Sequence, residues 1–324
     1  MLTLNSIFTS HMVLQAGKPV RLFGDGEGSV SVEFKGEVKS THANGKWLIE
    51  FAPAEYGGPY EITVVLDGHT TVLCDVYLGD VYLLGGQSNM ELKLRQTNFP
   101  TESYAGNENV RLYVVDKPIK EAICSADGWV KLTADNAGRF SAIGYHVATS
   151  LARDDRKIGL IGCYQGASVI QTWMPREIAT AEKYNVSDKY KDHVNYPHNG
   201  DGYLFELMTS KILPISLGAV LWYQGESNAS ESESKIYLSM LEDLITSWRR
   251  GFRDSELMFV VVQIADCLSR DTDAWHRIQR EQLRVQETLP NVKTVICRDV
   301  CENDDIHPQT KHILSKRIAD ALEG

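Results

Sequence analysis

Short apolar runs alternate with amphipathic segments from residue 76 to the end of this 324-residue chain. The runs predict strands, and the amphipathic segments predict helices between them. Strands that are apolar on both faces and separated by helices indicate a parallel sheet covered on both sides. The expected strands are Val81–Leu84, Ile158–Cys163, Leu217–Trp222, Met258–Ile264 and Val292–Ile296, and the expected helices are Arg139–Ala152, Ile236–Phe252, Trp275–Leu289 and Lys311–Leu322. The pattern therefore predicts an α/β fold, a doubly wound parallel sheet flanked by helices, with ligands bound beyond the carboxyl ends of the strands.

Residues 1–75 follow a different pattern, with short alternating runs between turn residues. Val30–Phe34 follows Gly26–Gly28, and Tyr60–Val65 follows Gly57–Pro59. This pattern is typical of antiparallel strands. We expect a small N-terminal antiparallel domain resembling a β-sandwich at 1–75 and the α/β domain at 76–324, with the boundary between residues 73 and 76.

Charge and hydropathy exclude several classes of partner. The formal net charge is −10, and no basic run is longer than Arg249-Arg250, which argues against nucleic acid or an anionic membrane as partner. The first residues lack the features of a signal peptide, and no stretch approaches eighteen uninterrupted apolar residues. We therefore expect a cytoplasmic protein, and the sequence leaves a homo-oligomer open.

The six cysteines do not form a metal-binding pattern. They are scattered through apolar contexts, and Cys297 and Cys301 have no second pair with which to bind zinc. Asp304 and His307 likewise lack further ligands nearby in the sequence. We expect buried reduced thiols, no metal site and no cofactor.

Ser88 is the candidate nucleophile. It follows the expected strand Val81–Leu84 and two glycines, Gly85 and Gly86, which permit a tight turn that presents a hydroxyl at the edge of the sheet. The motif is not the Gly-x-Ser-x-Gly elbow, because Met90 replaces the second glycine. A serine in this position can instead cap a helix.

His307 is the candidate base for Ser88. It stands in Asp304-Asp305-Ile306-His307-Pro308, between the last expected strand and the last helix. A neutral imidazole could take the serine proton, while Asp304 accepts its other N–H and fixes the tautomer. The alternative is a surface histidine near the start of a helix.

Two further strand ends carry candidate donors for an oxyanion. Gly166 follows Ile158–Cys163, and its amide could approach a developing negative charge without obstruction by a side chain. The polar run that includes Gln224 and Asn228 follows Leu217–Trp222, and either side chain could donate to the same oxygen. A glycine turn and a solvated loop are the alternatives.

With these motifs, the chain resembles the sialate O-acetylesterase family of the SGNH hydrolase superfamily over nearly its whole length. The resemblance implies an SGNH/flavodoxin-like fold, Ser88 as nucleophile, His307 as base and Asp304 as its partner. It also implies an oxyanion hole made by the amides of Ser88 and Gly166 and a side chain of the Gln224 block. Glu226 is the rival acid. The motifs are His11–Gln15, Gly86–Met90, Trp222–Asn228 and Asp304–Pro308.

The resemblance implies a serine carbohydrate esterase that removes O-acetyl groups through an acetyl-enzyme, with 9-O-acetyl sialic acid as the first candidate substrate. Alternatives are a deacetylase of xylan or other oligosaccharides, a lipid or thioester hydrolase, and a carbohydrate-binding protein without catalysis. The expected specificity segments are 93–135 and 175–203. The candidate substrate-binding residues are Gln87, Asn89, Gln165, Trp173 and Arg176, with Arg95, Arg139, Tyr196 and Tyr203 as further candidates for a carboxylate or a sugar face.

Overall fold

The structure, a computed structural model, describes residues 2–118, 128–190 and 195–324. Its strands are β1 (Thr3–Leu4), β2 (Val13–Gln15), β3 (Val20–Phe34), β4 (Glu37–Phe51), β5 (Gly57–Leu66), β6 (His69–Gly86), β7 (Asn107–Val114), β8 (Val130–Leu132), β9 (Ile158–Tyr164), β10 (Ala219–Tyr223), β11 (Met258–Val262) and β12 (Val292–Val295). Its α-helices are α1 (Ser88–Glu91), α2 (Ala134–Ala137), α3 (Ala142–Leu151), α4 (Arg176–Ala179), α5 (Tyr203–Leu207), α6 (Glu233–Gly251), α7 (Asp273–Thr288) and α8 (His312–Glu323).

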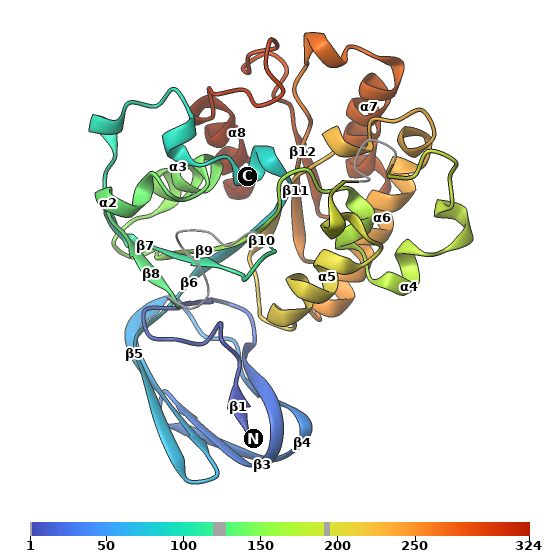
Figure 1. Cartoon of the computed structure of the whole chain (residues 1–324). Coiled ribbons are helices and arrows are strands. Elements are labelled where there is room, and N and C mark those ends of the chain that lie inside the picture. Colours follow the sequence, from blue (N-terminus) through green and yellow to red (C-terminus); the bar gives the residue numbers. More distant parts are fainter. Residues whose placement is uncertain (1, 119–127, 191–194) are drawn as a thin grey trace.

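A large, mostly parallel sheet occupies the centre of the molecule (Figure 1). Its strands run in the order β8-β7-β9-β6-β10-β11-β12, and every neighbouring pair is parallel except β7 with β8. The central strands β9, β6 and β10 are apolar on both sides, as the sequence predicts. The five predicted strands are confirmed. Strands β7 and β8, at one side of the sheet, were not predicted, since both lie inside the segment 93–135 that we expected to be a loop.

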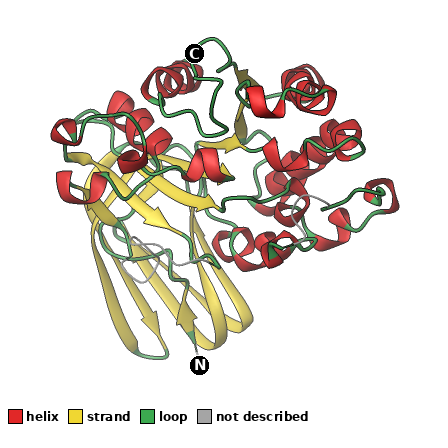
Figure 2. Cartoon of the chain, turned by 45° about the horizontal axis from the view of Figure 1, so that its top comes forward, coloured by secondary structure: helices red, strands yellow, loops and turns green. Residues whose placement is uncertain are grey.

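Helices cover the two faces of this sheet. In Figure 1, α3 and α8 lie on one side and α6 and α7 on the other, and Figure 2 shows helices on both sides of the strands. Helices α6, α7 and α8 each bury an apolar stripe and expose a charged face, whereas α3 has no charged face and is buried over most of its length. The α/β fold is therefore confirmed.

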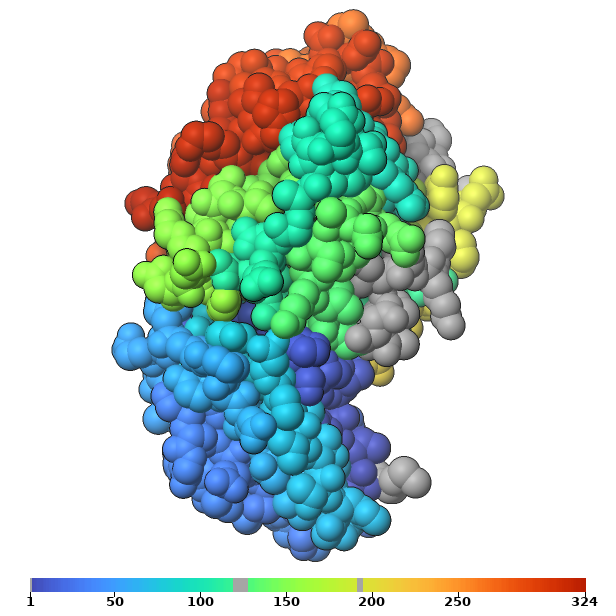
Figure 3. Space-filling model, turned by 90° about the vertical axis from the view of Figure 1, so that its left-hand side faces the viewer, coloured from blue at the N-terminus to red at the C-terminus, as the bar shows by residue number. Residues whose placement is uncertain are grey.

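The strands before the central sheet are mostly antiparallel, although β2 pairs in parallel with β6. β3 pairs with β4 and β5, and β5 pairs with the first half of β6. These residues gather at one end of the molecule, shown in blue in Figure 3. β6 runs without a break through the predicted boundary at residues 73–76 and enters the parallel sheet. The division into domains at 1–75 and 76–324 stays a prediction.

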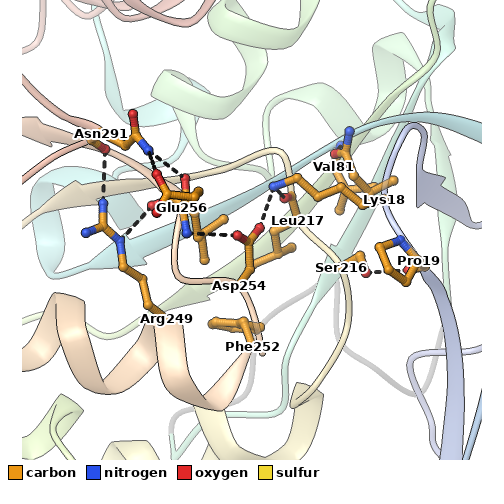
Figure 4. Close-up of polar contacts among 12 residues, drawn as sticks. Lys18, Pro19, Val81, Ser216, Leu217, Arg249, Phe252, Asp254, Glu256 and Asn291 are labelled. Atoms are coloured by element: carbon orange, nitrogen blue, oxygen red, sulfur yellow. Dashed lines mark hydrogen bonds and ion pairs between the residues drawn. The ribbon is translucent and has the colours of Figure 1, made fainter. Parts of the chain in front are cut away.

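Polar contacts join the N-terminal strands to the end of the central sheet opposite the strand ends that carry the site (Figure 4). Lys18 Nζ donates to Leu217 O at 2.7 Å and to Asp254 Oδ2 at 2.6 Å. Ser216 Oγ donates to Pro19 O at 2.5 Å. These contacts hold in place the residues that lead into β10.

The cysteines are free within the described residues. Cys163, Cys267 and Cys297 are buried, as expected, but Cys74 is exposed because its strand position faces outward in β6. Cys124 lies outside the described residues. In the described part of the chain, no helix is long and apolar enough to cross a membrane.

Candidate active site

The order of the central strands brings three polar segments together. β6 lies between β9 and β10, so the residues that follow these strands meet at one edge of the sheet. Gly86 makes the approach possible: its φ is 126°, and a Cβ there would lie 2.1 Å from Tyr223 O. Gln87 N donates to the same carbonyl at 3.0 Å and fixes the turn before α1.

Ser88 and His307 meet in this turn. Ser88 Oγ lies 2.8 Å from His307 Nε2, although 219 residues separate them in the chain. Ser88 is the first residue of α1, so its backbone amide has no acceptor within the helix. The structure thus places a hydroxyl, an imidazole and a backbone amide without a partner in its own helix at the same strand end.

The surroundings of His307 keep its imidazole neutral near pH 7. Burial lowers the pKa of His307 below its ordinary value of 6.5, the Asp305 carboxylate opposes this shift, and the Lys311 ammonium adds to it. Asp305 Oδ1 accepts a hydrogen bond from the backbone amide of His307 at 2.9 Å. Asp304 is exposed, and among the described residues no hydrogen bond joins it to the imidazole. Its role as partner of His307 stays a prediction.

Glu226, the rival acid, lies in a buried network. Its Oε1 accepts from Asn89 Nδ2 at 2.6 Å, and Asn89 also donates to Ile306 O at 2.9 Å. The buried Lys311 donates to Asn89 Oδ1 at 2.7 Å. Burial raises the pKa of Glu226, while the Asn89 N–H and the Lys311 charge favour its ionised form. Asn89 therefore positions this network behind the histidine.

The unused oxygen of Glu226 distinguishes it from Asp304. Glu226 Oε2 is buried without a hydrogen-bond partner among the described residues, and Glu226 lines the same cavity as His307. An unpaired buried carboxylate oxygen costs free energy unless a group in the site uses it. Glu226 therefore shares the cavity wall with His307, whereas Asp304 does not, and the choice between them as the acid stays a prediction.

We expect Glu226→Gln to lower kcat/KM more than Asp304→Asn does. Removing a buried charge near His307 is expected to cost about tenfold or more, whereas an exposed carboxylate interacts through water and is worth under about 1 kcal/mol. Rates of 4-nitrophenyl acetate hydrolysis measure both variants, and thermal melts show that each remains folded. A larger loss in Asp304→Asn would assign the acid to Asp304 instead.

The Gly166 amide, a predicted oxyanion donor, is occupied by a carboxylate. Gly166 N donates to Glu91 Oε2 at 2.6 Å, and Lys117 Nζ donates to Glu91 Oε1 at 2.5 Å. Ala167 adopts a positive φ of 56°, and Asn199 Nδ2 holds its carbonyl at 2.9 Å, so the loop is locally constrained. The sequence did not single out Glu91, although it stands one helical turn after Ser88.

Gln224 and Asn228, the other predicted oxyanion donors, do not line the cavity. Gln224 Nε2 donates to Gln87 Oε1, Ser168 O and Asn228 Oδ1 at 2.8–3.2 Å. Asn228 Nδ2 donates to Gln171 Oε1 at 2.8 Å and to Glu233 Oε1 at 3.4 Å. Both side chains are fully buried, because the polar run after β10 folds inward instead of facing solvent. Their amide hydrogens hold the loops together in this structure.

Gln87 and Gln165, two of the predicted substrate-binding residues, line the cavity. Gln87 Oε1 accepts from Ser227 N at 3.2 Å and from Gly225 N at 3.4 Å, so this side chain fastens the loop after β10. Gln165 Nε2 donates weakly to Gly166 O at 3.4 Å, and its Oε1 is buried without a partner among the described residues. Gln165 is therefore the better placed to meet a ligand.

The other substrate-binding candidates lie away from the cavity. Trp173 is fully buried, and its Nε1 donates to Ser168 Oγ at 2.9 Å. Arg176 forms an exposed ion pair with Glu206, with Nε and Oε1 2.9 Å apart. Arg95, Arg139, Tyr203 and Asn89 are also absent from the cavity wall.

The cavity has a volume of about 540 Å³ and contains both Ser88 and His307. This volume is within the roughly 300–1,000 Å³ of small-molecule sites. The predicted specificity segments contribute Gln96, Tyr196 and His198, while 119–127 and 191–194 lie outside the described residues. Sequence reasoning did not single out the polar wall residues Glu91, Gln96, His198, Ser227 and Arg270. Of these residues, only Glu91 could have been found from the sequence, because it lies one helical turn after Ser88.

Across residues 2–118, 128–190 and 195–324, no group of three or more His, Cys, Asp or Glu side chains is placed to hold a metal ion.

The family of the chain follows from comparison with known proteins. The family model described as carbohydrate esterase, sialic acid-specific acetylesterase matches residues 78–323. The chain belongs to this family. It is therefore a carboxylic ester hydrolase of the sialic acid-specific acetylesterase family, and the matched residues contain the whole Ser88 and His307 site.

Curated and solved relatives of this esterase agree with the family. Sialate O-acetylesterase of Homo sapiens is 26% identical, covering 97% of this chain and 69% of the relative. Sialate O-acetylesterase of Rattus norvegicus is 25% identical, covering 97% of the chain and 71% of the relative. A carbohydrate acetylesterase from Xanthomonas citri has a similar structure, with a TM-score of 0.86, 28% identity, and coverage of 99% of this chain and 74% of that one.

Proposed function

We propose that this esterase removes O-acetyl groups from sialic acid, with Ser88 as nucleophile and His307 as base. The observation that carries the mechanism is the 2.8 Å contact between Ser88 Oγ and His307 Nε2 in the wall of the cavity. Ser88 Oγ attacks the acetyl carbonyl while His307 takes its proton. His307 then protonates the leaving sugar oxygen, and water hydrolyses the acetyl-enzyme to release acetate.

Arg270 supports an anionic sugar as substrate. It is the one Arg or Lys in the wall of the cavity as described, and its guanidinium has no hydrogen bond or ion pair among the described residues. Its 3₁₀ turn, η10 (Leu268–Arg270), is tied to the loop of His307 through Leu268 N and Asn303 O at 2.8 Å. Arg270 therefore lines the cavity on a turn that is hydrogen-bonded to the segment before His307.

A guanidinium in this position suits the carboxylate of sialic acid, because the planar fork can donate two hydrogen bonds to one carboxylate. Neutral acetylated sugars have no carboxylate to accept these two hydrogen bonds. Arg270 is therefore the residue that would select sialic acid esters over acetylated xylo-oligosaccharides.

We expect Arg270→Gln to lower kcat/KM for 9-O-acetyl sialic acid by about 10- to 100-fold, the value of charged hydrogen bonds of about 1.5–3 kcal/mol. The carboxyl methyl ester of the same substrate removes the negative charge, and its hydrolysis should change less than about threefold. Acetate release from both compounds measures the difference.

Arg95→Gln is the matched control, because Arg95 is exposed and outside the cavity. Equal losses on the acid and its methyl ester in Arg270→Gln would refute the carboxylate contact. Faster release from acetylated xylo-oligosaccharides than from either sialic acid compound would identify a neutral carbohydrate as the substrate.

A further inference from the structure

Glu91 holds the backbone amide that the reaction needs for the ester carbonyl. Its Oε2 accepts from Gly166 N at 2.6 Å, a short, charge-assisted hydrogen bond. A Cβ built on Gly166 would lie 3.5 Å from Glu91 Oε2 and 3.6 Å from Ser88 Cβ. The carboxylate and the nucleophile therefore face the same small volume beside Gly166.

One N–H cannot serve two acceptors well, since a hydrogen bond weakens steeply away from linearity. The acetyl carbonyl must therefore displace Glu91 Oε2 before Gly166 can stabilise the oxyanion. We propose that Glu91 is an internal competitor for the oxyanion amide, which selects neutral acetyl esters against anionic ligands, including the product acetate. This inference rests on the proposed role of Gly166 in ester hydrolysis.

The product resembles the competitor. Acetate is a carboxylate of the same chemistry as the Glu91 head group, so the two compete for Gly166 N, and their like charges repel at short range. A neutral acetyl ester displaces Glu91 without adding a second negative charge to the ground state. Glu91 therefore hastens the departure of acetate and excludes ester groups whose acyl part carries a carboxylate.

Lys117 determines where Glu91 remains after displacement. Lys117 Nζ lies 2.5 Å from Glu91 Oε1, and the lysine side chain is almost fully buried. The ion pair can persist while Oε2 turns away from Gly166, so the displaced carboxylate stays charged beside the acyl site. The same geometry indicates that Glu91→Gln would free the Gly166 amide.

In Glu91→Gln, the glutamine has one side-chain oxygen, and Lys117, a donor without acceptors, takes it. The glutamine NH₂ group then faces Gly166 N and cannot accept from it. The amide is left open for a ligand, while the size of the side chain is preserved.

The test measures inhibition by acetate of 4-nitrophenyl acetate hydrolysis in wild type, Glu91→Gln and Glu102→Gln, an exposed glutamate outside the cavity. We expect the inhibition constant of acetate to fall about tenfold in Glu91→Gln, equivalent to about 1.4 kcal/mol, and kcat/KM to rise. Glu102→Gln should match wild type. Calorimetric titration of acetate into Ser88→Ala and Ser88→Ala/Glu91→Gln should give the same tenfold difference without turnover.

An unchanged inhibition constant, or a kcat/KM that falls in folded Glu91→Gln, would overturn the competitor role. An aryl acetate and free acetate contain no sugar, so an error in the proposed sialic acid substrate cannot affect this result. The two proposals therefore fail separately.

Discussion

Changing Ser88 to alanine is expected to lower kcat/KM for acetyl esters by roughly 10³-fold or more. Ser88 Oγ is the atom that would carry the acetyl group, and it lies in the cavity wall 2.8 Å from His307 Nε2. Alanine removes this oxygen and keeps the backbone amides of the turn. Acetate release from 4-nitrophenyl acetate and from 9-O-acetyl sialic acid measures the loss.

The stability of Ser88→Ala should change little, because the variant loses one side-chain hydrogen bond worth about 0.5–1.5 kcal/mol. A thermal melt checks this. Ser103→Ala, an exposed serine outside the cavity, is the matched control and should keep the wild-type rate. Turnover by Ser88→Ala at the wild-type rate would show that Ser88 is not the nucleophile. It would also contradict the mechanism through an acetyl-enzyme on Ser88.

Replacing His307 with glutamine should also lower kcat/KM by roughly 10³-fold, because glutamine can hydrogen-bond to Ser88 but cannot accept its proton. The pH profile supplies a second readout. The neutral imidazole is the active form, so activity is present above the pKa of His307 and is lost as the pH falls through it. Burial lowers that pKa, and the acid limb of wild type should therefore have its midpoint below pH 6.5.

The pH profile of the residual activity of His307→Gln should lack this acid limb. A wild-type midpoint above pH 7, or an acid limb that persists unchanged in His307→Gln, would show that another group acts as the base. His276→Gln is the control, since His276 is paired with Asp271 on the surface and lies outside the cavity.

Much of the fold could be predicted because buried strands and helices show a local pattern of apolar residues in the sequence. Strands such as β9 and β10 are apolar throughout, and helices such as α6 show a regular apolar stripe. β7 escaped prediction because its first residues, Asn107 to Asn109, are polar, and only its second half enters the core. The charged residue Arg111 also interrupts its apolar stretch, although the structure buries it.

The candidate site was predictable only in part. Ser88 and His307 were found because each belongs to a distinctive motif after a strand, and the structure brings them into contact. Asp304 was favoured on spacing within its own loop, yet the structure leaves it exposed and places Glu226, from a distant segment, in the cavity wall. The spacing of Asp304 and His307 shows only that the two residues are near each other in the sequence. It gives no information about another carboxylate, such as Glu226, that the fold brings to the site from a distant segment.

The sequence by itself determined that polar segments follow buried parallel strands, and hence that Ser88, Gly166 and the Gln224 block would meet at one edge of the sheet. Only the tertiary structure decided which of their groups face the cavity. Gln224 turns inward, and Glu91 reaches across to Gly166. The physical reason is that strand order and burial are fixed by patterns of apolar residues, whereas the direction of a polar side chain depends on which partner, often far away in the chain, satisfies its hydrogen bonds.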